Sequence, residues 1–331
     1  MRQNVNQLVQ EENPEEEQLL TSLRAASWAE FHGQERVKEA ILIGTQAAKT
    51  RGEALDHLLF YGPPGLGKTT LAHLIAKEMG SNLKVTSGTA LTKVGDLAAI
   101  LTNLESHDVL FIDEIHRLPK VVEETLYPAM EDFALDIVIG KGPSARTVRL
   151  DLPPFTLVGA TTRFGALTGP FRDRFGATYR LQYYQPPELT TILQHAGQKL
   201  DLSLAEPEAL LLARRARGTP RIALKLLKRV RDFAQVRFGG ELSAASITQA
   251  LDLLDVDQLG LTDGDRFLLQ TIIKKYAGGP VGLSTLSAAI SEDESTIEEV
   301  LEPYLLQIGF LQKTPKGRVV TPAARQHLQK A

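Results

Sequence analysis

The chain has 331 residues, a length that predicts two or three domains. Its 43% hydrophobic and 23% charged content is typical of a globular protein. The absence of cysteine excludes disulfides and thiolate-ligated zinc, and no apolar run approaches the ~18 residues of a membrane helix, so we expect a cytoplasmic protein without membrane contact. The net charge of −3 excludes a global basic field, so any nucleic acid must be contacted locally or through assembly.

Residues 1–184 begin with an acidic segment and continue as an α/β pattern. Glutamates at positions 11, 12, 15, 16 and 17 predict a solvated, disordered tail over residues 1–22. From 23 to 184, predicted helices alternate with short apolar strands at 58–61, 83–86, 108–113, 155–162 and 178–183. Five strands with intervening helices predict an open, mostly parallel sheet.

Two smaller domains are predicted after residue 184. Amphipathic stretches at 188–200, 207–217, 220–237 and 243–254 predict a helical domain over 185–255. From 256 to 331 the pattern predicts helices near 264–276, 284–290 and 295–308, followed by a hairpin about the turn Thr314-Pro315-Lys316-Gly317. Three helices and a hairpin are typical of a winged-helix domain.

The segment 62–69, Gly-Pro-Pro-Gly-Leu-Gly-Lys-Thr, matches the phosphate-binding loop G-x-x-x-x-G-K-[ST]. It follows an apolar strand and precedes a helix, as such a loop must. Glycines at 62, 65 and 67 let backbone N–H groups converge on phosphate oxygens at the positive end of that helix. Lys68 is expected to reach the β- and γ-phosphates of ATP, and the Thr69 hydroxyl to bind Mg²⁺.

A second motif indicates hydrolysis rather than binding alone. Residues 108–114, Asp-Val-Leu-Phe-Ile-Asp-Glu, read as a strand buried on both faces that ends in two carboxylates. Such strands end at the carboxyl edge of the sheet, where ligands bind. We expect Asp113 to hold Mg²⁺ through water and Glu114 to polarise the attacking water.

Two further groups fit an ATPase site, each with a structural alternative. Thr162, more than Thr161, ends the strand 155–162 and suits contact with the γ-phosphate or the attacking water; the alternative is a cap on the next turn. Arg174, in the segment Phe-Arg-Asp-Arg-Phe-Gly at 171–176, suits an arginine finger lent by a neighbouring subunit. The alternative is a structural ion pair, either Arg172–Asp173 or Arg174–Asp132.

In the helical domain, Gly-Thr-Pro-Arg at 218–221 opens a predicted helix and places Arg221 where it can report the nucleotide state. Nine Lys or Arg residues lie between 214 and 237 against one acidic residue. They form either a DNA-binding stripe or a solvated helix face, and the apolar positions between them favour the face.

The last domain is nearly neutral, with eight basic and nine acidic residues between 256 and 331. Its basic cluster lies in the hairpin, at Lys313, Lys316 and Arg318. This pattern favours sequence-independent contact with DNA phosphates through the wing. A domain that binds protein alone is the alternative.

Long stretches resemble the RuvB family of bacterial Holliday-junction branch-migration motors, which are AAA+ ATPases. They include Leu-Phe-Tyr-Gly-Pro-Pro-Gly-Leu-Gly-Lys-Thr-Thr at 59–70, Asp-Val-Leu-Phe-Ile-Asp-Glu-Ile-His-Arg-Leu at 108–118, Tyr-Pro-Ala-Met-Glu-Asp-Phe at 127–133 and Ala-Arg-Arg-Ala-Arg-Gly-Thr-Pro-Arg-Ile-Ala at 213–223. The likeness covers nearly the whole chain from residue 23. It implies an AAA+ P-loop ATPase core at 23–184, a helical lid at 185–255 and a winged-helix head at 256–331.

The resemblance also implies roles for individual residues. Thr162 would be sensor 1, Arg174 the finger acting in trans and Arg221 sensor 2. The nucleotide pocket would further include Leu23, Arg24, Thr70, Tyr184 and Pro220, with Glu131, Asp132 and Phe133 approaching from a neighbouring subunit. Lys313 and Arg318 match wing positions that contact the DNA backbone. Glu294 stands where many relatives have a basic residue, so the DNA inference rests on those two.

As a function, the resemblance implies an ATP-driven motor that translocates duplex DNA at four-way junctions in recombination and repair. Six identical subunits would form a ring, the hairpin 134–150 would dock the partner RuvA, and RuvC would join in the resolving complex. Two alternatives are a clamp-loader-like remodelling ATPase and an ATP-switched DNA-binding regulator.

Overall fold

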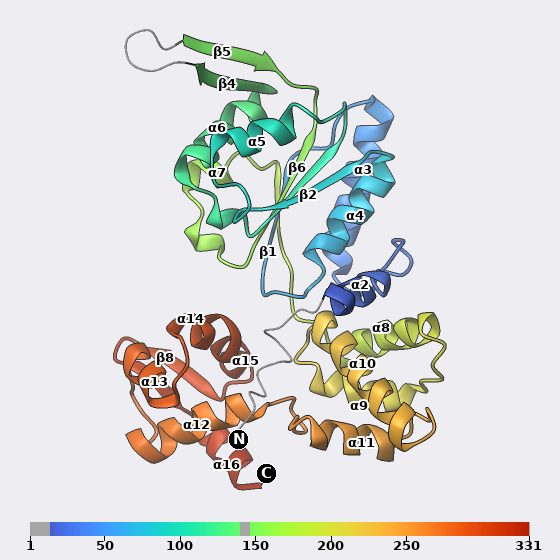
Figure 1. Ribbon diagram of the computed structural model, residues 1–331, viewed down its shortest axis with the longest axis vertical. Coiled ribbons are helices and arrows are strands. Elements are labelled where there is room, and N and C mark those ends of the chain that lie inside the picture. Colours follow the sequence, from blue (N-terminus) through green and yellow to red (C-terminus); the bar gives the residue numbers. More distant parts are fainter. Residues whose placement is uncertain (1–13, 140–145, 331) are drawn as a thin grey trace. The chain divides into compact units, whose positions relative to one another are not determined.

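The computed structural model describes residues 14–139 and 146–330 (Figure 1). The chain divides into two compact units. One is Arg24–Tyr184, and the other combines Met1–Leu23 with Gln185–Ala331. Each unit has its own core.

The unit Arg24–Tyr184 is built on a five-stranded sheet with the order β2-β3-β6-β1-β7, in which all paired strands are parallel. In that order the strands are β2 (Leu83–Ser87), β3 (Val109–Asp113), β6 (Thr156–Thr161), β1 (Leu58–Tyr61) and β7 (Ala177–Arg180). The central strand β6 is buried at all six positions, which explains its unbroken run of small and apolar residues. The predicted five-stranded parallel sheet is therefore confirmed.

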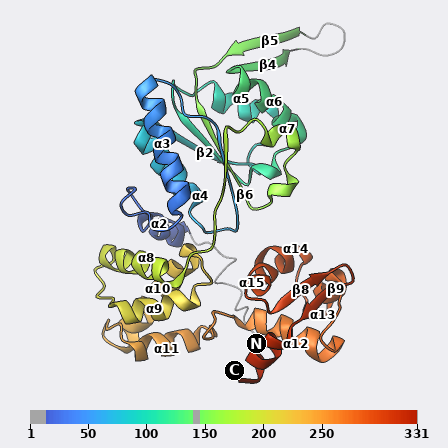
Figure 2. The same ribbon diagram turned by 180° about the vertical axis from the view of Figure 1, so that it is seen from behind.

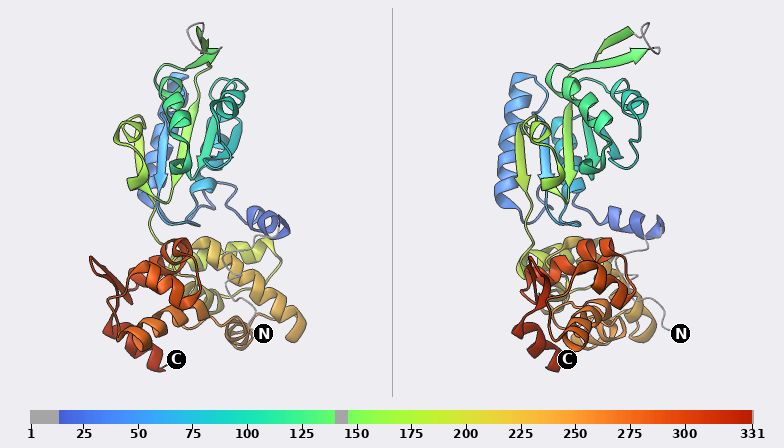
Figure 3. Two further views of the ribbon diagram at one scale, coloured as in Figure 1. Left: turned by 60° about the vertical axis from the view of Figure 1, so that its left-hand side comes forward. Right: turned by 90° about the vertical axis from the view of Figure 1, so that its left-hand side faces the viewer.

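Helices cover both faces of this sheet (Figures 1 and 3). On one side lie α3 (Glu35–Arg51) and α4 (Lys68–Met79), and on the other lie α5 (Val94–Leu101) and α6 (Lys120–Glu131). A short helix α7 (Gly169–Arg172) precedes β7. Leu97, Leu126 and Phe155 are fully buried in the core between the sheet and the second helix layer.

A two-stranded antiparallel hairpin, β4 (Ala134–Ile139) and β5 (Arg146–Asp151), extends from this unit beside α6 (Figure 1). Every described side chain of β5 is exposed, including Val148 and Leu150. Residues 140–145, which the sequence places at the hairpin tip, lie outside the described residues.

In the second unit, four helices form the lid: α8 (Pro186–Lys199), α9 (Glu206–Arg215), α10 (Pro220–Arg237) and α11 (Ala244–Leu253). The predicted disordered tail over residues 1–22 is wrong in its last part. Residues Pro14–Ser22 form helix α2, which contacts α10. Leu20 of this helix and Leu23, the residue after it, are both buried. Apolar contact therefore orders an otherwise acidic segment. Residues 1–13 lie outside the description.

The head has the predicted winged-helix elements and one additional helix. Its elements are α12 (Asp263–Tyr276), α13 (Leu283–Ile290), α14 (Glu294–Thr296), the π-helical turn Ile297–Leu301, α15 (Glu302–Gln307), β8 (Leu311–Thr314), β9 (Gly317–Val320) and α16 (Pro322–Lys330). Strands β8 and β9 pair side by side as the wing (Figure 2). The predicted helix 295–308 is interrupted because Pro303 has no N–H to continue the regular ladder.

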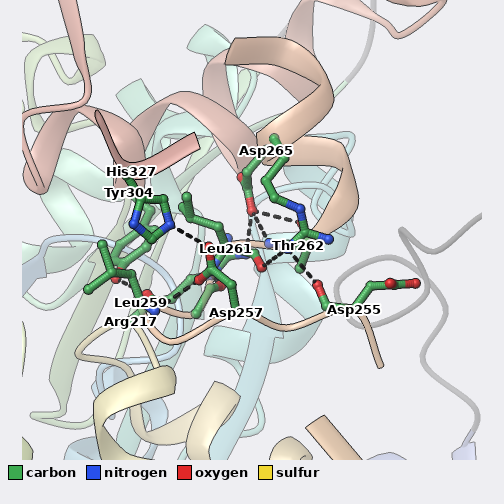
Figure 4. Close-up of polar contacts among 11 residues, drawn as sticks. Arg217, Asp255, Asp257, Leu259, Leu261, Thr262, Asp265, Tyr304 and His327 are labelled. Carbon is green, nitrogen blue, oxygen red and sulfur yellow. Dashed lines mark hydrogen bonds and ion pairs between the residues drawn. The ribbon is translucent and has the colours of Figure 1, made fainter. Parts of the chain in front are cut away.

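Polar contacts pin the connection between lid and head (Figure 4). Arg217, next to the end of α9, donates from Nε to the Gly260 carbonyl at 2.7 Å and pairs with the fully buried Asp265 of α12. His327 of α16 contacts the Asp257 carboxylate at 2.6 Å. These contacts tie the linker 255–262 to elements on both of its sides.

His57, directly before β1, is a buried polar group in the sheet unit. Its Nδ1 accepts a hydrogen bond from the Leu157 N–H at 2.9 Å, so Nε2 carries the proton that it donates to the Met130 carbonyl at 3.0 Å. Burial lowers the pKa of His57 below its ordinary value.

This burial predicts acid sensitivity. Because the folded-state pKa is depressed, His57 contributes stability that is fully present above about pH 6.5 and is lost as the pH falls toward the folded-state pKa. In that window the free energy of unfolding should fall by up to ~1.4 kcal/mol per pH unit because of this group. His57→Gln, which can donate and accept but not titrate, should reduce this slope in urea unfolding from pH 7 to 5. An unchanged slope would contradict the assignment.

Candidate active site

The loop between β1 and α4 has the shape that its glycines predict. Gly62 has φ of 142°, and a Cβ there would lie 2.7 Å from the Leu181 carbonyl oxygen, so only glycine fits. Gly67, with φ of 100°, is the N-cap of α4, which begins at Lys68. The Leu66 carbonyl accepts a hydrogen bond from the Tyr184 hydroxyl at 3.2 Å. Gly65 also has positive φ, and Thr69 and Thr70 follow in the first turn of α4.

Lys68 is buried, although it is charged. Its ammonium group donates to the carbonyls of Gly62 and Pro63, each at 2.9 Å, so it lies over the loop. Burial lowers the pKa of Lys68, while the charges of Asp113 and Glu114 act in the opposite direction. A cation with this little hydration is suited to a polyanionic ligand.

Two carboxylates lie at the carboxyl end of β3, as predicted. Burial raises the pKa of Asp113, and the charges of Lys68 and Arg24 partly offset the effect. Glu114 has φ of 45°, in the left-handed region that non-glycine residues rarely adopt. Within the described ranges, no group of three or more His, Cys, Asp or Glu side chains could hold a metal ion.

Thr162 meets Glu114 at this edge. The Thr162 hydroxyl donates to Oε2 of Glu114 at 2.9 Å, and the Thr162 N–H approaches the same oxygen at 3.4 Å. Thr161 is fully buried and is bonded to the ring of His116 at 2.9 Å, so it is not the exposed hydroxyl of the pair. His116 was missed by sequence reasoning, although its place two residues after Glu114 was the available signal.

Arg174 lies just after α7 and is held within its own unit. Its guanidinium pairs with Glu131 at 3.2 Å, lies 4.1 Å from the ring centre of Tyr127 and donates to the Pro170 carbonyl at 2.7 Å. Arg174 therefore makes a structural ion pair, but with Glu131 rather than with the predicted Asp132, which pairs with Arg149 at 2.8 Å. The Arg172 guanidinium lies 4.9 Å from the Phe164 ring centre, and no ion pair between Arg172 and Asp173 is found within residues 14–139 and 146–330.

The remaining predicted nucleotide residues are divided between elements of the two units. Glu131 and Asp132 end α6 and are exposed, whereas Phe133 packs against Phe155. Leu23, Pro220 and Arg221 belong to the other unit, where Pro220 and the exposed Arg221 open α10.

In the wing, the two predicted DNA contacts differ in exposure. Lys313 and Arg318 are opposite each other in the β8–β9 register. The Lys313 side chain is 50% exposed and pairs with Glu298 at 3.0 Å, while the Arg318 side chain is only 8% exposed. Arg318 makes ion pairs with the nearly inaccessible Glu302 and with Glu298. Lys313 is therefore accessible to a phosphate, whereas Arg318 is occupied by carboxylates of its own domain; contact of the two residues with DNA stays a prediction.

Three family models match the chain in succession. They are the Holliday junction DNA helicase RuvB P-loop domain at residues 23–181, the RuvB AAA lid domain at 184–257 and the RuvB C-terminal winged helix domain at 258–329. No helix within 14–139 or 146–330 is long and apolar enough to cross a membrane.

Solved structures agree with these models. The Thermotoga maritima RuvB Holliday junction branch migration motor is 50% identical, with a TM-score of 0.84 over 93% of this chain and 98% of that one. A Thermotoga maritima RuvB point mutant matches with a TM-score of 0.85 at the same identity and coverage. The resemblance, the three-part fold class and the predicted enzymatic activity are confirmed. The chain belongs to the RuvB family and is a P-loop ATPase that drives Holliday-junction branch migration.

Proposed function

We propose that the chain works in the cytoplasm as a homo-hexameric ring around duplex DNA, with ATP and Mg²⁺, and with RuvA and RuvC as partners at the four-way junction. The observation that carries the catalytic part is the meeting of Lys68, Asp113, Glu114 and Thr162 at one edge of the parallel sheet. An ammonium group and two carboxylates at such an edge suit the cleavage of a phosphoanhydride bond.

Each group in the sheet unit has a separate task in this proposal. The loop amides and Lys68 bind the phosphates, and Thr69 with Asp113 would hold Mg²⁺, which supplies charge neutralisation when bound. One hydroxyl and one carboxylate fit Mg²⁺, which keeps most of its waters and takes phosphate oxygens as further ligands. Glu114 orients the attacking water, and Thr162 relays the state of the γ-phosphate to it.

The finer nucleotide contacts follow the resemblance. Arg24, Tyr184, Leu23 and Pro220 would surround the adenine and ribose, with Thr70 beside the phosphates. Arg221 would act as sensor 2. Glu131, Asp132 and Phe133 would approach the nucleotide bound to a neighbouring subunit.

Contact with RuvA is assigned to the hairpin 134–150. Strand β5 exposes Val148 and Leu150 among charged neighbours, and exposed apolar residues on a projecting hairpin suit a protein partner. This part of the proposal rests on the resemblance and on that exposure.

Arg174 is proposed to act on ATP held by the adjacent subunit. The Tyr127 ring and Glu131 fix its guanidinium at a defined place, which reduces the entropy cost of using it. Arg174→Ala should leave ATP binding intact and lower kcat by ~10³–10⁵-fold. Steady-state ATPase assays with Arg172→Ala as the matched control measure this effect, and rings mixed with wild type should be impaired. A mutant that turns over alone at normal rate would refute the trans role.

The two wing cations should respond differently to substitution. Lys313→Ala should weaken binding to unrelated duplexes equally and reduce the salt slope by about 1 per subunit contact. Arg318→Ala should instead lower stability by about 1–3 kcal/mol, because the buried Glu302 loses its hydrogen-bonded partner and is left with Lys313 at 3.5 Å. Fluorescence anisotropy against salt and urea unfolding separate these effects, with the exposed Lys274→Ala as control. Equal loss of DNA binding without destabilisation in both variants would assign both residues to DNA.

The function as a whole is tested by ATP-dependent migration of a synthetic four-way junction, with and without RuvA. Wild-type protein should migrate the junction, and Glu114→Gln should bind ATP but neither hydrolyse it nor migrate DNA. ATPase activity that ignores junction DNA and RuvA would favour the clamp-loader-like alternative. Strong preference for one duplex sequence would favour the ATP-switched regulator.

A further inference from the structure

The turn after β3 brings a histidine back against the catalytic edge. Glu114 adopts a left-handed conformation, and residues Ile115–Arg117 form a 3₁₀ turn directly after it. Gly88 makes this turn possible, because a Cβ at that position would lie 2.4 Å from the Glu114 carbonyl oxygen. The turn places the His116 side chain among the ends of β3 and β6, where it is only 6% exposed.

His116 contacts both the carboxylate of Glu114 and strand β6. Its Nδ1 lies 3.2 Å from Oε2 of Glu114 and 2.9 Å from the hydroxyl of Thr161. The Thr161 hydroxyl accepts the Arg163 N–H at 3.0 Å, which anchors it to the backbone after β6. An ionised carboxylate can only accept hydrogen bonds, so Nδ1 must carry a proton, and its single N–H is then shared between Oε2 of Glu114 and the Thr161 hydroxyl oxygen.

Oε2 of Glu114 is therefore contacted by two side chains that belong to different elements. Thr162 donates to it from the end of β6, and His116 approaches it from the turn after β3. Thr162 is exposed, whereas the His116 ring is enclosed and is steadied by the buried Thr161. The Thr162 hydroxyl is thus accessible to a bound phosphate, whereas the His116 ring is held in a fixed position.

We propose that His116 is a positioning residue for ATP hydrolysis, which holds the Glu114 carboxylate through Nδ1 so that it meets the attacking water in the correct orientation. The inference rests on the proposed role of Glu114 as the group that polarises this water. Since a displacement near 1 Å can cost ~10²-fold in rate, loss of the imidazole contact should lower kcat rather than ATP affinity.

Two isosteric substitutions separate this role from simple packing. The amide nitrogen of asparagine lies as many bonds from Cα as Nδ1, whereas that of glutamine corresponds to Nε2. His116→Asn should therefore keep kcat within about 3-fold of wild type, and His116→Gln and His116→Ala should lower it by about 10- to 100-fold. The KM for ATP should change by no more than about 2-fold in all three, because the phosphate-binding groups are untouched.

The test measures Mg²⁺-ATPase rates of the full chain over a range of ATP concentrations, with thermal melting to confirm folding. Lys120→Ala, an exposed substitution four residues away, is the matched control. Equal kcat in the Asn and Gln variants, or a rise in KM that accounts for the loss, would overturn the inference.

The outcome for Glu114→Gln separates this inference from the proposed function. If that variant hydrolyses ATP normally, the role of Glu114 fails and the role of His116 fails with it. If it is inactive while His116→Ala and His116→Gln turn over at the wild-type rate, only the inference about His116 is wrong.

Discussion

The parallel arrangement of β3, β6 and β1 is the constraint on which the site depends. Parallel strands all end at the same edge of a sheet, so groups at the carboxyl ends of three strands become neighbours although they lie far apart in the sequence. The loop after β1, the carboxylates after β3 and the threonines that end β6 meet in this way. The sheet core behind them is fully buried at the central strand, which makes this edge a rigid support.

Local backbone distortion at that edge adds to what the sheet provides. The loop glycines occupy conformations that a side chain would obstruct, and Glu114 accepts a left-handed conformation although it is not glycine. Unfavourable backbone conformations persist where the surrounding structure enforces them, and here they direct a carboxylate toward Thr162 and His116. The geometry of the site is therefore imposed by the surrounding fold and not by the conformational preferences of the individual residues.

Burial decides which of the charged residues can act on a ligand. Lys68 is enclosed but faces phosphate-binding groups, so its charge is available to an anion that enters the loop. Arg318 is equally enclosed, but two carboxylates of its own domain surround it. The positive charge of Arg318 and the negative charges of the two carboxylates compensate each other. Removing either partner would leave a buried charge without full compensation, which is destabilising. Lys313, on the neighbouring strand, keeps half of its surface exposed.

The sequence by itself determined the features that depend on neighbours along the chain. The phosphate loop, the buried strand with its terminal carboxylates, the helical lid and the winged hairpin are all local patterns of glycine, apolar period and turn residues. Tertiary structure decided the rest: the partner of Arg174, the burial of Arg318, the helix at Pro14–Ser22 and the contact of His116 with Glu114. These features depend on which side chains lie nearby in space, and the charge or polarity of a residue does not reveal which group it will meet after folding.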